Sequence, residues 1–155
     1  MRFLPLAIAA ALCAGAAQAQ PAAPAAASPA EFMARTAKEP GVTSLPSGLE
    51  YKIVTSGPAG GPSPKPGDII KVHYEGKLTN GQVFDSSFER GKPVLMPLEG
   101  LVPAWMEALP KMKVGDEWTL YVPPQLGYGP AGAGPIPPNA VLIFRVKLLG
   151  LLSAD

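Results

Sequence analysis

The chain contains one cysteine, Cys13, and one histidine, His73. Cys13 lies in the apolar N-terminal run, so a chain that loses this run has neither a disulfide nor a thiol nucleophile. A single histidine excludes a metal site built on two histidines. His73 alternates with apolar residues in the run IIKVHYEGKL, and we expect it to face outward from a strand.

An excess of charge of one sign is also missing. The chain has 13 basic and 12 acidic residues, and loss of an N-terminal leader containing Arg2 leaves 13 − 1 = 12 of each. This balance lacks the basic excess of a nucleic-acid-binding protein. The sequence has no Gly-x-Ser-x-Gly elbow and no Gly-x-x-x-x-Gly-Lys phosphate loop. We therefore expect no nucleic-acid partner, no metal and no cofactor.

The first 19 residues have the order of a secretory signal peptide. Arg2 precedes an apolar run, Phe3–Ala17, which leads into the small-residue sequence Ala17-Gln18-Ala19. The run is too short to cross a membrane comfortably. We predict cleavage after Ala19 and a periplasmic or secreted mature protein without a membrane span. A lipid anchor at Cys13 is less favoured, because bulky Leu12 precedes it.

Composition divides the remaining chain into three parts. Residues 20–27 are an alanine- and proline-rich linker. Residues 28–44 are predicted to be a short helical extension, because Ser28 and Glu31 have capping-box spacing and a Pro-Gly pair follows. Whether this extension is ordered or mediates association stays open. Residues 45–152 are expected to form one domain.

The domain contains several short runs typical of strands. They are LEYKIVTSG (an expected edge strand), IIKVHYEGKL, QVFDSSF, KPVLMPL, EWTLYVPP and AVLIFRVKLLGLL. An Asn-Gly turn at 80–81 predicts that QVFDSSF runs antiparallel to IIKVHYEGKL. The near-continuous apolar character of the last run predicts a central strand covered on both faces.

A short helix is predicted between the fourth and fifth of these strands. Its apolar residues have i, i+3, i+4, i+7 spacing: Val102, Trp105, Met106 and Leu109. Several antiparallel strands, one helix and two further strands indicate an α+β fold. We expect a twisted antiparallel sheet, a half-barrel, wrapped around this short helix.

Asp85 stands out because it lies in an otherwise apolar strand, GQVFDSSF. A catalytic acid, a metal ligand, a turn residue and a hydrogen-bonding group in an apolar pocket are all consistent with this position. Ser86 and Ser87 follow it without a histidine or lysine beside them, so they have no evident base to activate a nucleophile. The purely structural alternative is that these three residues form a bulge.

Three longer segments, taken together, resemble the FKBP-type peptidyl-prolyl cis–trans isomerases. They are YEGKLTNGQVFDSSFERGKPV, LVPAWMEALPKMKVGDEWTLYVPPQLGYG and IPPNAVLIFRVKLL, and they follow one another in the family's order over about residues 45 to 150. The joint occurrence of VFDSS, a tryptophan helix, LGYG and IPPN makes the resemblance specific. It implies a half-barrel sheet around a short helix, a proline pocket between them, and rotamase activity.

The resemblance also implies site residues. The expected catalytic residues are Asp85, Tyr128, Phe84 and Trp105. The expected substrate-binding residues are Tyr74, Arg90, Val94, Leu101, Val102, Ile136 and Phe144. Trp105 resembles the pocket floor, and Asp85 resembles the family's buried aspartate, with Tyr74 and Arg90 as its candidate partners. Val94 and Met96 stand where many relatives have aromatic residues, which should soften one wall.

The implied partners are proline-containing unfolded or partly folded proteins, together with macrolide inhibitors. Longer relatives carry an extensive helical dimerisation arm, and residues 28–40 are too short for it, so we expect a monomer. The main alternative is a non-catalytic peptide-binding module or folding chaperone that uses the same pocket. A purely structural envelope protein is the remaining alternative.

Overall fold

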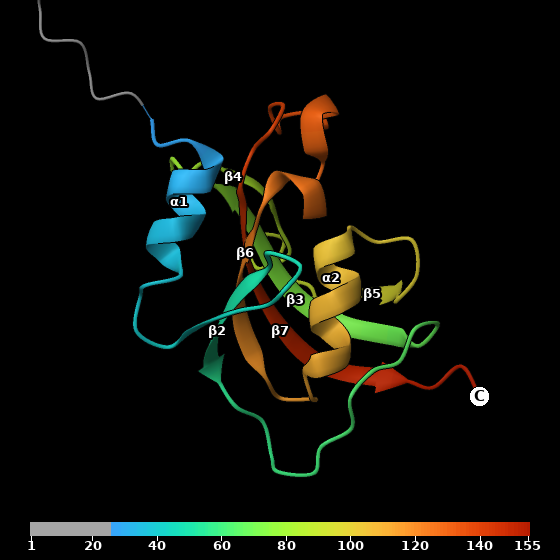
Figure 1. The fold of residues 1–155 in the computed structure, drawn as a ribbon. Helices are drawn as coiled ribbons and strands as arrows, with labels where there is room; N and C mark the ends of the chain where they lie inside the picture. The colour runs from blue at the N-terminus through green and yellow to red at the C-terminus, as the bar shows by residue number, and fades with distance from the viewer. Residues whose placement is uncertain (1–25) are drawn as a thin grey trace, which may run out of the picture.

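The structure, a computed structural model, describes residues 26–155 (Figure 1). The predicted signal peptide and most of the predicted linker therefore lie outside the described residues. The described residues form one seven-stranded antiparallel sheet with two α-helices. None of the helices within residues 26–155 has the length and apolar character needed to cross a membrane.

The sheet has the strand order β1-β2-β6-β7-β3-β4, and β5 pairs with the same edge of β3 as β4 does. In chain order the strands are β1 (Val42–Ser44), β2 (Glu50–Thr55), β3 (Ile69–Leu78), β4 (Val83–Ser86), β5 (Val94–Pro97), β6 (Glu117–Val122) and β7 (Leu142–Leu152). The predicted hairpin is confirmed, because β4 follows the Asn-Gly turn and pairs antiparallel with β3.

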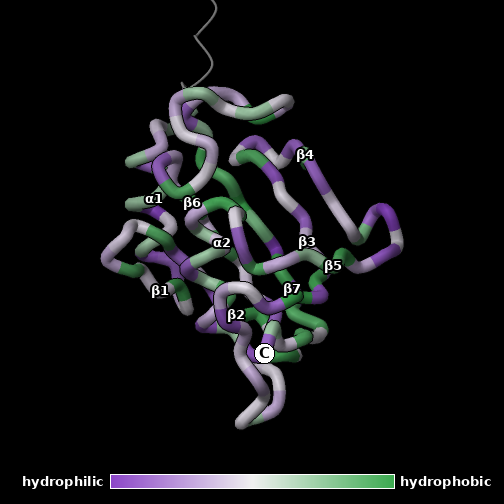
Figure 2. The backbone as a smooth tube through the Cα atoms, turned by 90° about the vertical axis from the view of Figure 1, so that its right-hand side faces the viewer, coloured by the Kyte–Doolittle hydropathy of each residue, from purple (hydrophilic) through white to green (hydrophobic). Residues whose placement is uncertain are grey.

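The helix α2 (Pro103–Ala108) packs on one face of the sheet and continues as a 3-10 turn, Leu109–Lys111. Its residues Trp105 and Ala108 are buried in one hydrophobic core with the inward side chains of β3, β6 and β7. The hydropathy-coloured trace shows that β7 is largely hydrophobic, with hydrophilic positions between its hydrophobic ones (Figure 2). The predicted α+β fold, a twisted sheet around a short helix, is confirmed.

The helix α1 (Pro29–Thr36) lies on the opposite side of the sheet from α2 (Figure 1). The predicted capping box is present: the backbone N–H of Ser28 donates to Glu31 Oε2 at 2.8 Å, and Ser28 Oγ accepts from the Glu31 N–H at 3.3 Å. Met33 and Thr36 are the buried residues of this helix. Thus α1 covers part of the sheet face that α2 leaves free.

Two strand predictions need correction. Residues 42–44 form β1 instead of continuing the helical extension, and β1 pairs with β2, so β2 is not an edge strand. The central position predicted for β7 is right, but its cover on both faces is wrong. Phe144 and Val146 are buried whereas Arg145 is exposed, because α2 covers only the inward face of this strand.

Candidate active site

A cavity of about 280 Å³ lies between α2 and the inward face of the sheet. We call it the Trp105 pocket. The predicted site residues that line it are Tyr74, Phe84, Asp85, Leu101, Val102, Trp105, Tyr128 and Phe144. Met96 and Gly100 complete the lining. Residues from β3, β4, β5, β7, α2 and two loops therefore meet around one apolar recess.

Edge-to-face contacts with Tyr74 and Phe144 hold the Trp105 ring in place. Its ring centroid lies 5.3 Å from that of Tyr74 and 5.5 Å from that of Phe144, with interplanar angles of 84° and 82°. Phe84 and Phe144 make the same kind of contact at 5.7 Å. Edge-to-face pairs of this kind contribute about 0.5–1.5 kcal/mol each beyond the area they bury, which helps to hold the rings in place. The indole Nε1 of Trp105 is buried without a hydrogen-bond acceptor among residues 26–155.

Gly76 in β3 allows these rings to approach each other. A Cβ atom at this position would lie 2.5 Å from Phe84 and 2.9 Å from Phe144, closer than real side chains come. Gly76 pairs with Asp85 and the next residue of β3 pairs with Val83, so Phe84 is the additional residue of a β-bulge. The bulge lies at Phe84, one residue before the expected Asp85–Ser87 position. Gly76 was missed, although a glycine inside an alternating strand is itself a signal of close approach.

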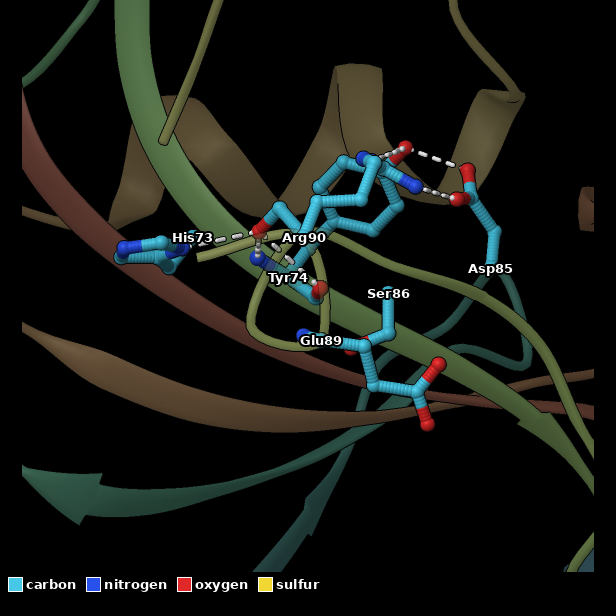
Figure 3. A network of polar contacts seen from close by, with 7 residues as sticks. His73, Tyr74, Asp85, Ser86, Glu89 and Arg90 are labelled. Atoms are coloured by element: carbon cyan, nitrogen blue, oxygen red, sulfur yellow. Dashed lines mark hydrogen bonds and ion pairs between the residues drawn. The ribbon is translucent and has the colours of Figure 1, made fainter. Parts of the chain in front are cut away.

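Asp85 forms the centre of a polar network at the mouth of the pocket (Figure 3). Its carboxylate accepts hydrogen bonds from the Tyr74 hydroxyl and from the Arg90 guanidinium. Arg90 Nη2 also lies 3.4 Å from the Tyr74 hydroxyl oxygen. These are the two partners that the sequence predicted. The Asp85 side chain is 40% exposed, however, so it is less buried than the family resemblance implied.

Hydrogen bonding and burial set the protonation states of Asp85 and Tyr74. Desolvation acts to raise the pKa of Asp85, but hydrogen bonds from Tyr74 and Arg90, together with the Arg90 charge, hold it below its ordinary value. Burial and the adjacent Asp85 carboxylate raise the pKa of the Tyr74 phenol. At neutral pH Asp85 is therefore an ionised acceptor beside a protonated phenol. It holds no proton to donate, which argues against a catalytic acid.

Ser87 holds the backbone of Tyr74 in place through two hydrogen bonds. Its Oγ accepts a 2.8 Å hydrogen bond from the Tyr74 N–H, and its own N–H donates to the Tyr74 carbonyl at 2.9 Å. The same Oγ lies 2.9 Å from His73 Nδ1, and the His73 ring stacks on Phe88 with centroids 4.7 Å apart. Ser87 is fully buried. The serine and the histidine thus act as supports on the outer side of β3.

Three predicted substrate-binding residues do not line the pocket. Arg90 reaches it only through Asp85 and Tyr74. Val94 lies at the start of β5 opposite Val72, and Met96, two residues further on the same face of the strand, lines the cavity in its place. Ile136 is 6% exposed and belongs to the hydrophobic core. Tyr128 lines the pocket and is 40% exposed at its rim.

Comparison with protein families gives two matches. The model of the FKBP-type peptidyl-prolyl cis-trans isomerase matches residues 60–149. The model of the domain amino terminal to FKBP-type peptidyl-prolyl isomerase matches residues 7–53. The first match contains every residue of the Trp105 pocket, and the second contains α1 and β1.

Individual relatives agree with this. The chain is 48% identical over 121 residues to the peptidyl-prolyl cis-trans isomerase Mip of Coxiella burnetii, covering 77% of this chain and 52% of that protein. The FKBP-type 22 kDa isomerase of Escherichia coli is 45% identical, with 79% and 59% covered. The chain spans about half the length of the curated relatives it matches.

Solved structures share the fold. The crystal structure of FkpA from Escherichia coli is similar with a TM-score of 0.77 and 41% identity, covering 82% of this chain and 59% of that one. A peptidyl-prolyl cis-trans isomerase of Pseudomonas syringae has a TM-score of 0.74 and 32% identity, with 81% and 91% covered. The family match, these relatives and the shared sheet-and-helix architecture show that the chain belongs to the FKBP-type peptidyl-prolyl cis–trans isomerase family.

Proposed function

We propose that the protein is a peptidyl-prolyl cis–trans isomerase that accelerates rotation about X–Pro bonds while other proteins fold. The observation that carries the proposal is the apolar recess floored by Trp105 and open at Tyr128. Its substrates are proline-containing unfolded or partly folded polypeptides. No bond has to be broken in this reaction, which agrees with the shortage of nucleophiles and bases around the recess.

The physical task is to stabilise a twisted amide. Unaided X–Pro exchange takes tens to hundreds of seconds, because rotation disrupts amide resonance. The planar amide has the larger dipole, so water stabilises it more than it stabilises the twisted form. An apolar pocket removes this advantage of the planar form. About ten turnovers per second requires roughly three decades of acceleration, or about 4 kcal/mol.

The pocket residues divide this task between them. The proline ring of the substrate packs against Trp105, Phe84 and Phe144, which exclude water from the rotating bond. The Tyr128 hydroxyl at the rim donates to a substrate carbonyl. The ionised Asp85 does not transfer a proton; with Arg90 it holds the Tyr74 side chain and sets the electric field at the mouth. Val94 and Ile136 support the walls from outside.

We also propose that the protein acts outside the cytoplasm. The residue order of the first 19 residues supports a cleaved leader, and a relative 41% identical over 124 residues is named outer membrane protein MIP of Legionella longbeachae.

The domain boundary and the oligomeric state are further parts of the proposal. Because β1 pairs with β2, we place the start of the isomerase domain at Val42 instead of Leu45. The intact mass of exported protein tests the cleavage site, and sedimentation tests the expected monomer.

A protease-coupled assay with a proline-containing tetrapeptide tests the activity. We expect catalysis well above the uncatalysed rate, inhibition by a macrolide, and a higher melting temperature with the macrolide bound. Trp105→Leu, which keeps an apolar side chain on α2, should lose most of the rate. A rate equal to background, with aggregation of client proteins still suppressed, would favour the non-catalytic chaperone instead.

A further inference from the structure

A second and larger cavity, of about 700 Å³, lies beside α1. We call it the α1 groove. Its lining comes from α1, from the start of β2 and from the loop after β6: Pro29, Ala30, Met33, Gly48, Glu50, Pro123, Pro124, Gln125, Gly129, Pro130 and Asn139. A cavity of this size is within the usual range for ligand-binding sites.

Glu50 is the unusual member of this lining. The residue is 5% exposed, and its Oε2 atom is buried without a hydrogen-bond partner among residues 26–155. None of the salt bridges in this part of the chain involves it. A buried carboxylate without a donor is costly, and proteins satisfy nearly all such groups. Glu50 therefore lines the groove with one oxygen that has no donor within the described residues.

Two other buried carboxylates of the same domain show the ordinary solution. Asp68 accepts backbone hydrogen bonds from Lys65 at 2.8 Å and Ala154 at 3.1 Å. Asp116 accepts from the Gly57 N–H at 2.6 Å and pairs with Lys113 at 2.8 Å. The chain thus supplies donors to each of these buried acids. It supplies none to Glu50 Oε2 within the described residues.

The electrostatics of the groove favour a cation. Burial, and the negative charge of Glu39 in the turn between α1 and β1, raise the pKa of Glu50. Tyr121 lies opposite Glu50 in the β2–β6 ladder, and burial together with Glu39 and Glu50 raises the pKa of its phenol. Desolvation is the larger cause of both shifts, and the nearby carboxylates Glu39 and Glu50 add to it. An incoming ammonium or guanidinium group would stabilise the ionised form of the Glu50 carboxylate.

The rest of the groove suits a polypeptide. Prolines and Met33 form apolar walls that can pack against aliphatic side chains. Gln125 and Asn139 are exposed at the rim, where their amides can donate to and accept from a peptide backbone. Gly129 and Pro130 line the groove directly after Tyr128, which lines the Trp105 pocket, so one loop borders both cavities.

We propose that the α1 groove is a second polypeptide-binding site, selective for a segment that carries a lysine or arginine between apolar residues. The cation pairs with the Glu50 carboxylate, and the neighbouring aliphatic side chains pack on the proline walls. The site requires no proline in the ligand. It is therefore separate from the proposed isomerase activity, and it stands even if that activity is absent.

Binding of a proline-free pentapeptide to the full chain tests the site. The probe is acetyl-Ala-Leu-Lys-Leu-Ala-amide, and its matched control has norleucine in place of the lysine. Titration followed by NMR should show the lysine peptide binding about tenfold tighter than the norleucine peptide. The side-chain amide signals of Gln125 and Asn139 should shift, and a macrolide in the Trp105 pocket should not displace the peptide.

Two variants assign the selectivity. Glu50→Gln keeps the shape of the side chain and should bind both peptides equally, with an unchanged isomerase rate. Glu99→Gln removes the same charge from an exposed residue outside the groove and should keep the tenfold preference.

The proposal is overturned if the native chain binds both peptides equally, if Glu50→Gln retains the preference, or if the macrolide competes. Shifts at Gln125 and Asn139 that depend on protein concentration without peptide would instead identify a second copy of the chain as the occupant.

Discussion

The two faces of one sheet hold carboxylates in opposite situations. On the inward face, Asp85 receives hydrogen bonds from Tyr74 and Arg90 although it is 40% exposed. On the outward face, Glu50 is 5% exposed and its Oε2 receives none within the described residues. The first carboxylate is held in place before any ligand arrives. The second carboxylate needs a donor from a bound partner. This difference distinguishes a preorganised pocket from an open binding groove.

Removal of the Trp105 side chain, the floor of the pocket, should have the largest effect on stability and activity. Trp105→Ala deletes a 5%-exposed indole in contact with Tyr74 and Phe144. We expect the free energy of unfolding, measured by urea denaturation, to fall by about 3–5 kcal/mol, with loss of isomerase activity and macrolide binding. Trp105→Leu should remain folded and bind the lysine peptide as before. If the Leu variant lost that peptide too, the two cavities would not be separate.

A methyl group at Gly76 should have the next largest effect. In Gly76→Ala, the added Cβ would have to displace Phe84 and Phe144, and such overpacking costs about 1–3 kcal/mol. We expect a slower isomerase reaction and weaker macrolide binding. Gly150→Ala is the matched control in β7, because no atom lies within 4 Å of the added Cβ. Equal rates for both variants would show that the Phe84–Phe144 contact does not shape the pocket.

Loss of the paired carboxylate should have a smaller effect. Asp85→Ala leaves the Tyr74 hydroxyl and the Arg90 guanidinium without their acceptor. Because the carboxylate is 40% exposed, solvent screens the network, and we expect a cost of about 1 kcal/mol in stability. The isomerase rate should fall about tenfold as Tyr74 loses its orientation. Unchanged stability together with an unchanged rate would remove Asp85 from the site.

The pH dependence of stability should differ in sign between the two carboxylates. The pKa of Asp85 is lowered on folding, so its contribution is present above the unfolded pKa and is lost as pH falls through the folded value. The pKa of Glu50 is raised, so its contribution is present below the unfolded pKa and is lost as pH rises through the folded value.

Melting temperatures between pH 4 and pH 7 measure this difference. Glu50→Gln should melt above the native chain at pH 7, and the gap should shrink toward pH 4, where Glu50 is protonated. Asp85→Asn should melt below the native chain at pH 7, and that gap should shrink only as the pH falls below about 4. A constant gap for Glu50→Gln across this range would mean that its carboxylate is already satisfied.

The sequence predicted the inward side of the molecule better than the outward side. Strands β3 and β4 and the helix α2 follow from local spacing, and the partners of Asp85 follow from the family resemblance. The burial of Glu50 does not, because in LEYKIVTSG it occupies an alternating polar position typical of an exposed residue. Its burial requires the outward sheet face to be covered by α1, an arrangement that no local pattern encodes.

Two further differences have the same origin. The three residues of β1 are too few to show a period, so only pairing with β2 makes them a strand. The apolar run of β7 predicts burial but does not distinguish one covered face from two. The position of Phe84 in a bulge, and the need for Gly76 opposite it, depend on the register between β3 and β4.

The position of β7 has a consequence for biosynthesis. This strand is the last in chain order, yet it lies between β6 and β3 and joins the two halves of the sheet. A nascent chain without residues 142–152 cannot connect these halves, so cooperative closure waits until translation has passed this segment. A ribosome-bound nascent chain should therefore stay sensitive to protease until residues 142–152 emerge.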